Sequence, residues 1–117
     1  MNRDRLLADA KAKALSLVDG YNPPEPPTFR LPGPSGRVAM KMAAEGFRKQ
    51  GKATPYDMVV SDTLAEVLSG GEADLVDIVT EQDLLALEHK GFMARVHDPR
   101  SVARVEQMML TGKPLRN

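Results

Sequence analysis

Prolines crowd into one short stretch of this chain and divide it into two unequal parts. Residues 21–36 read YNPPEPPTFRLPGPSG and hold six of the nine prolines. Proline cannot occupy a helix interior, and it biases the preceding residue toward extended backbone. We therefore expect a semi-rigid, polyproline-like spacer over residues 21–34, rising about 3 Å per residue. A PxxP ligand for another domain is the alternative interpretation of the same run.

Helical periodicity dominates both sides of this spacer. Before it, apolar residues recur every three or four positions and predict one helix within residues 1–20. That stripe consists of Leu7, Ala10, Ala14 and Leu17. The region 35–117 is expected to form a helical domain, with residues 72–79 either a short extended piece or a turn. The predicted fold class is all-α: one N-terminal helix, the proline-rich spacer, and a compact cluster of about four short helices.

Capping residues mark the starts of the later helices. Thr54 and Thr80 are each followed three positions later by an aspartate, the pattern of a capping box. Asp98 precedes a proline, which suits the first position of a helix. Ser35 is expected to cap the helix that follows the spacer. These signals predict helices that begin near residues 35, 54, 80 and 98.

The apolar stripes of these helices are expected to form the core. They comprise Val38, Met42, Phe47, Val60, Leu64, Val67, Leu68, Leu84, Leu85, Phe92, Val96, Val102, Val105 and Met109. Glu88 lies on this apolar side, and burying an unpaired charge is costly. We therefore expect Glu88 to be a buried structural acid paired with an arginine or with backbone amides. The alternative is that the stripe is solvated at its edge and that Glu88 points outward.

Several kinds of chemistry have no support in the sequence. The chain has no cysteine, which excludes disulfides, thiolate metal sites and cysteine nucleophiles. His89 and His97 lie about 12 Å apart by helical rise, too far to share a metal ion. No phosphate loop, dinucleotide-binding glycine motif or nucleophile elbow occurs. We therefore expect no catalytic, cofactor-binding or metal-binding residue here.

The charges balance overall but fall into blocks. The chain has 16 basic and 16 acidic residues. Residues 30–52 carry six Lys or Arg and one acid, residues 53–89 carry nine acids and no Lys or Arg, and residues 90–117 carry six basic and two acidic residues. Either the blocks complement each other when the helices pack, or the two basic blocks converge on a phosphorylated ligand. A neutral chain without a long apolar run indicates neither nucleic-acid nor membrane binding, so a cytoplasmic location is expected.

The spacer and the last third of the chain resemble a known enzyme family. Residues 81–92 read EQDLLALEHKGF, and residues 104–117 read RVEQMMLTGKPLRN. With the run GYNPPEPPTFRLPGPSG, these segments resemble the C-terminal end of the long bacterial 3-hydroxyacyl-CoA dehydrogenases of fatty-acid β-oxidation. In that family an NAD-dependent dehydrogenase part is followed by an enoyl-CoA hydratase (crotonase-like) part. The resemblance covers nearly all of the chain.

The resemblance implies a C-terminal helical fragment of such a multifunctional enzyme. Residues 1–20 would end the crotonase core, and residues 35–117 would cap the acyl-CoA site and mediate subunit contacts. Lys113 and Arg116 would lie near CoA. NAD and acyl-CoA would be the cofactor and substrate of the parent enzyme, whose active centres are not in this chain. We therefore expect the chain to be inactive alone.

A different class of function fits the same sequence. The chain could be an independent helical interaction module, in which the spacer or the acidic block docks a partner. If the chain is instead part of the larger enzyme, surfaces meant for the crotonase core are exposed, and large apolar patches drive association. The expected partners are the rest of the parent enzyme and a second copy of the chain, with the first helix exchanged across the spacer.

Overall fold

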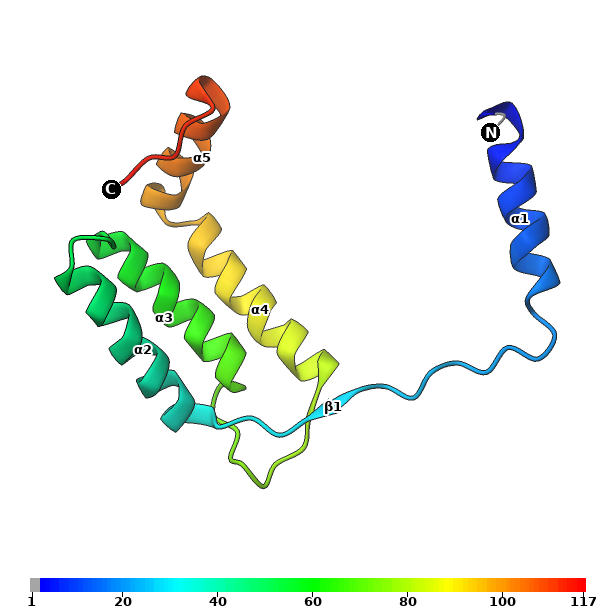
Figure 1. The fold of residues 1–117 in the computed structure, drawn as a ribbon, viewed down its shortest axis with the longest axis horizontal. Coiled ribbons are helices and arrows are strands. Elements are labelled where there is room, and N and C mark those ends of the chain that lie inside the picture. The colour runs from blue at the N-terminus through cyan, green and yellow to red at the C-terminus, as the bar shows by residue number, and fades with distance from the viewer. Residues whose placement is uncertain (1–2) are drawn as a thin grey trace.

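The computed structural model describes residues 3–117 as five α-helices with almost no strand (Figure 1). A 3₁₀ turn, Arg3–Arg5, leads into α1 (Leu6–Ser16), and the later helices are α2 (Gly33–Lys49), α3 (Pro55–Ser69), α4 (Glu81–Val96) and α5 (Pro99–Thr111). Two strands, β1 (Thr28–Phe29) and β2 (Val79–Thr80), have two residues each. The predicted all-α fold class is confirmed. No helix in the described range is both long and apolar enough to cross a bilayer.

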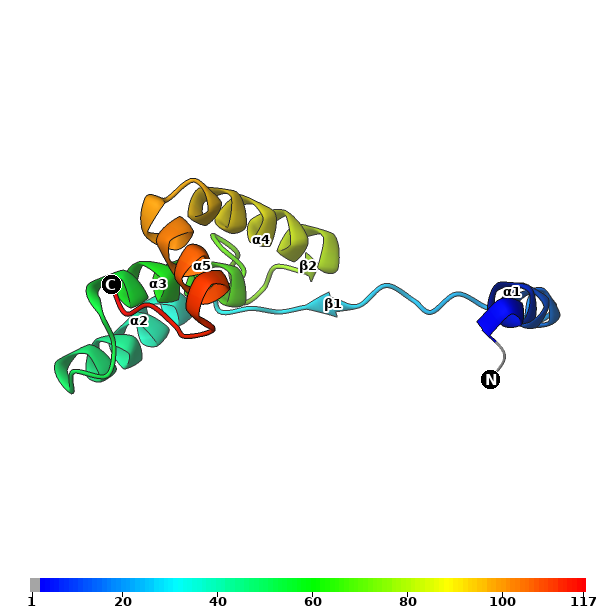
Figure 2. The same ribbon diagram turned by 90° about the horizontal axis from the view of Figure 1, so that it is seen from above.

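Helix α1 stands apart from the other helices (Figures 1 and 2). Every residue from 3 to 30 is exposed, and residues 21–27 have no regular secondary structure. The radius of gyration is 20.6 Å, whereas a compact domain of this length would have about 13 Å. The extended spacer that the prolines predict therefore holds α1 away from the rest of the chain.

A two-residue antiparallel ladder attaches the spacer to the helices. Thr28 pairs with Thr80, and Phe29 pairs with Val79. Val79 is buried, and the guanidinium of Arg30 donates to the carbonyl of Val76 at 3.1 Å. The end of the ambiguous segment 72–79 is thus extended. Pairs this short have too few residues for an alternating pattern to reveal them.

Both predicted capping boxes are present. The amide of Asp57 donates to Oγ1 of Thr54 at 3.1 Å, and the amide of Thr54 donates to Oδ2 of Asp57 at 2.8 Å. Thr80 and Asp83 make the same reciprocal pair at 2.9 and 3.2 Å. Asp98 caps α5 by accepting from the amide of Arg100 at 3.0 Å. Local sequence therefore sets the starts of α3, α4 and α5.

Helix α2 begins three residues earlier than predicted, because its N-cap is Pro32 and not Ser35. Ser35 does not cap it, because its Oγ donates to the carbonyl of Pro32 at 2.7 Å from inside the first turn. Gly33 occupies the first helical position with a φ of +55°, and a Cβ there would overlap the carbonyl oxygen of Ala73. Only glycine adopts this backbone without strain at so close an approach, so a contact with a distant loop sets the helix start.

The charge blocks pair with one another across the helix contacts. Arg37 of α2 binds Asp62 of α3 through two nitrogens at 3.2 and 2.9 Å, and its third nitrogen lies 3.2 Å from Glu66. Lys90 of α4 reaches the same Glu66 at 3.2 Å. The bidentate bond lowers the pKa of Asp62. The complementary arrangement predicted for the blocks is confirmed.

The core is small. Among the described residues, the apolar side chains that are buried are Tyr56, Ala65 and Val79, together with the polar Ser69. Most of the predicted core stripe is exposed instead: Val38, Met42, Phe47, Leu64, Leu68, Leu85, Phe92, Val96, Val102, Val105 and Met109. The prediction that these stripes are buried is wrong for the single chain. Ion pairs connect α2 to α3, and both helices carry large apolar side chains that are exposed.

Candidate interaction surface

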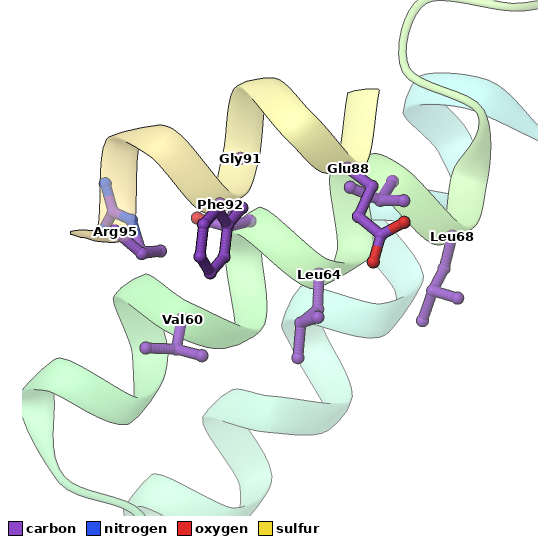
Figure 3. A pocket seen from close by; sticks show the side chains of 9 residues that line it. Val60, Leu64, Leu68, Glu88, Gly91, Phe92 and Arg95 are labelled. Atoms are coloured by element: carbon purple, nitrogen blue, oxygen red, sulfur yellow. The ribbon is translucent and has the colours of Figure 1, made fainter. Parts of the chain in front are cut away.

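An apolar groove of about 460 Å³ lies between α3 and α4 (Figure 3). Its lining comprises Val60, Thr63, Leu64, Val67, Leu68, Glu88, Gly91, Phe92 and Arg95. Leu64 is 56% exposed and Phe92 is 62% exposed. Figure 3 shows both projecting to the same side of the helix pair, together with Glu88. The groove therefore presents large apolar side chains to water.

Gly91 allows α4 to approach α3 closely at the groove. A Cβ at this position would lie 2.8 Å from Cγ2 of Thr63. The Thr63 side chain is fixed because its Oγ1 donates to the carbonyl of Val59 at 3.1 Å. The lack of a side chain at Gly91 thus permits a close contact between α3 and α4.

A second apolar groove, of about 390 Å³, lies between α4 and α5. Its lining comprises Phe92, Arg95, Val96, Ser101, Val102 and Val105. Phe92 and Arg95 border both grooves, so the two are continuous. We refer to the joined surface, formed by the linings of the two grooves, as the apolar face.

Two charged side chains of α4 lie on the apolar face. Glu88 is exposed, and its side chain forms no ion pair or hydrogen bond within residues 3–117. The prediction of a buried and paired Glu88 is wrong for the single chain, because Glu88 lies where the apolar face meets water. Arg95 has Nε and Nη1 buried without a hydrogen bond, and the carboxylate of Asp98 is 3.8 Å from Nη1. That carboxylate is held more closely by Arg100, at 2.8 Å.

A cluster around Tyr56 fixes the N-terminal end of α3 to α5. Tyr56 is 1% exposed, and its hydroxyl lies 2.6 Å from Oγ of Ser101. The guanidinium carbons of Arg100 and Arg104 lie 4.3 and 4.9 Å from the ring centre, within the range of cation–π attraction. Arg104 also forms an ion pair with Asp57 at 2.8 Å. The pKa of Asp57 is lowered, first by the Thr54 amide and also by Arg104.

The C-terminal tail closes on this cluster. Oδ1 of Asn117 accepts from Nε of Arg104 at 2.7 Å, and its amide donates to the carbonyl of Arg100 at 3.1 Å. Arg116 donates to the carbonyl of Lys52 at 3.0 Å. Sequence patterns missed this anchor, because hydrogen bonds between irregular segments have no periodicity. One nitrogen of the Arg116 guanidinium is therefore hydrogen-bonded within the chain, whereas the side chain of Lys113 is exposed.

The described residues offer no site for metal or dinucleotide chemistry. No group of three His, Cys, Asp or Glu side chains among residues 3–117 could hold a metal ion. His97 has Nδ1 2.7 Å from the carbonyl of Met93, within its own helix. The two strands are antiparallel and two residues long, so this range lacks the parallel βαβ unit that binds NAD.

Comparison with known proteins gives one informative similarity. The chain is 36% identical over 118 residues to a "Probable 3-hydroxyacyl-CoA dehydrogenase" of Bacillus subtilis (strain 168). The match runs along the whole chain. It spans 15% of that relative. The resemblance to a 3-hydroxyacyl-CoA dehydrogenase is thereby supported, and the crotonase-like part is not addressed by it. No described protein family and no solved structure matches the chain.

Proposed function

We propose that this chain is a helical part of a larger 3-hydroxyacyl-CoA dehydrogenase of fatty-acid β-oxidation. The observation that carries the proposal is the 36% identity along the whole chain to 15% of a relative with that description. The exposed apolar face supports it, because a contiguous apolar surface of this kind marks a contact with another protein part.

The chain contributes packing and not redox chemistry in this proposal. Residues 3–117 do not fit NAD, so hydride transfer belongs to another part of the polypeptide. The helical part packs against an enoyl-CoA hydratase-like part, caps its acyl-CoA site and contributes to subunit contacts. Lys113 is the tail residue best placed to reach the CoA phosphates, because its ammonium group is exposed and has no partner in the described chain.

The size of the native polypeptide tests this proposal. An antibody raised against the chain should detect a protein several times larger than 12.8 kDa in cell extracts. That protein, once purified, should reduce NAD with a 3-hydroxyacyl-CoA, followed by NADH absorbance. The isolated chain should produce no NADH. A native species of 12.8 kDa alone would instead support an independent interaction module.

The CoA contact has its own test. Lys113→Ala in the full polypeptide should raise KM for the CoA substrate and leave kcat nearly unchanged. The matched control is Lys49→Ala, another exposed lysine at the end of α2. Equal KM values for the two variants would exclude the Lys113 contact and leave the proposed parent enzyme intact.

A further inference from the structure

We propose that two copies of this chain exchange α1, so that α1 of each copy packs in the groove between α3 and α4 of the other. Helix α1 lies antiparallel to α4 of the partner, with Asp9 beside the partner's Arg95 and Lys13 beside the partner's Glu88. The inference depends on α1, the spacer and the apolar face alone. It has tests of its own, which involve neither NAD nor CoA.

Helix α1 lacks the contacts that would stabilise it. It has 11 residues, and isolated helices shorter than about 12–15 residues are marginal in water. Its apolar stripe comprises Leu6, Leu7, Ala10 and Ala14, and Leu17 and Val18 follow in the turn after the helix. Leu7 is 83% exposed. A helix of this kind becomes stable when its stripe is buried against another apolar surface.

The groove between α3 and α4 suits this helix in size and shape. Helix α1 is about 16 Å long, and Glu88 and Arg95 lie about 10 Å apart along α4. The alanines at the centre of the stripe, Ala10 and Ala14, allow close approach. Leu64 of α3 and Phe92 of α4 project to the same side of the helix pair. Helix α1 would lie between these two side chains, with Ala10 and Ala14 facing inward.

The charges beside the stripe match those of the groove. Asp9 and Lys13 lie one helical turn apart on one edge of α1. In an antiparallel arrangement they occur in the same order as Arg95 and Glu88. Their spacing along the axis is about 6 Å against about 10 Å, a difference that the long side chains of Lys13 and Arg95 can span. The side chains of Lys13 and Glu88 have no partner in the described chain. The partner of Arg95, Asp98, lies 3.8 Å away and is held more closely by Arg100, at 2.8 Å. The ion pair of Asp9 with Arg5, at 3.4 Å, is exposed and easily exchanged.

The spacer favours a second copy over the chain's own face. Strand β1 fixes the end of the spacer beside β2, immediately before α4. The prolines of residues 23–27 favour extended backbone, at about 3 Å per residue, and Figure 1 shows the segment leading away from the helices. Residues 17–20 already form turns, so docking on the same chain would need the extended spacer itself to fold back. Reciprocal exchange between two copies forms a closed dimer without this reversal.

Engineered disulfides distinguish the two arrangements, because the chain has no cysteine of its own. Tagged Ala14→Cys chain is mixed with untagged Leu68→Cys chain and oxidised. We expect a mixed disulfide dimer, in higher yield than with Ala8→Cys, a matched alanine on the opposite side of α1. A single chain with both Ala14→Cys and Leu68→Cys should give cross-linked dimers. Cross-linked monomers, or yields no higher than for Ala8→Cys, would overturn the proposal.

Light scattering and charge reversal provide a second measurement. The wild-type chain should have twice the mass of 12.8 kDa, and Leu7→Asp should be monomeric with α2–α5 still folded by circular dichroism. Lys13→Glu and Glu88→Lys should each raise the dimer Kd roughly threefold to tenfold, and the double variant should restore it. A monomeric wild type, or a dimer insensitive to Leu7→Asp, would contradict the exchange.

Discussion

The hydroxyl oxygen of Tyr56 lies 2.6 Å from Oγ of Ser101, and this bond joins the first turn of α3 to the first turn of α5 across 45 positions. Tyr56 is among the few fully buried side chains of the described chain. Arg104 lies beside its ring and also binds Asn117 in the tail. This corner therefore fixes the position of α5 and of the C-terminus together.

Removing the Tyr56 hydroxyl should weaken the attachment of α5. Tyr56→Phe leaves the Ser101 hydroxyl without its partner, at a cost of about 1–3 kcal/mol in the free energy of unfolding. Urea denaturation followed by circular dichroism measures this loss. Tyr21→Phe, at the chain's other tyrosine, is the control and should have no effect because Tyr21 is exposed. Equal stabilities for the two variants would show that the Tyr56 bond contributes nothing.

Adding a methyl group at Gly91 should separate α3 from α4. Helix propensity alone would favour Gly91→Ala by up to about 1 kcal/mol, but the new Cβ would lie 2.8 Å from Cγ2 of Thr63. We expect the steric effect to prevail, so thermal denaturation should show a lower Tm. Gly46→Ala in α2, where no atom lies within 4 Å, should instead raise Tm. Thr63→Ser should rescue Gly91→Ala, because it removes Cγ2 and keeps the hydroxyl.

Loss of the Asn117 side chain should release the tail. Asn117→Ala removes the acceptor of Arg104 and the donor to the Arg100 carbonyl. Amide hydrogen exchange in residues 113–117 should become faster, and the free energy of unfolding should fall by about 1 kcal/mol. Arg116→Ala, which removes one exposed bond to Lys52, should have a smaller effect. The reverse order would show that Arg116 anchors the tail.

Acid should destabilise the α5 cap through Asp98. The Arg100 hydrogen bond lowers the pKa of Asp98 from 3.8 to about 2. Because the folded pKa lies below the unfolded one, the stabilisation is present above pH 3.8 and is lost as pH falls toward 2. Asp98→Asn keeps a capping side chain but does not titrate, so its Tm should fall less over this range. Glu106→Gln in α5 is the charge-matched control and should follow the wild type.

The sequence correctly predicted the features that depend on residues close together in the chain. The caps at Thr54 and Thr80 were predicted correctly because each bond spans three positions. The extended spacer follows from the restricted backbone of proline. The charge blocks predicted that the helices would complement each other, but not that Arg37 would pair with Asp62. The predicted start of α2 was wrong because Gly33 is in close contact with Ala73, which lies in a distant loop.

By itself, then, the sequence determined the helices, most of their caps, the stiff spacer and the likeness to part of a 3-hydroxyacyl-CoA dehydrogenase. Tertiary structure decided that Glu88 is exposed, that Gly91 meets Thr63, and that Asn117 closes on Arg104. The physical reason is the range of the interactions. An apolar stripe shows which side of a helix is stabilised by burial. Only the packing of distant segments shows which of these stripes remain exposed in the single chain.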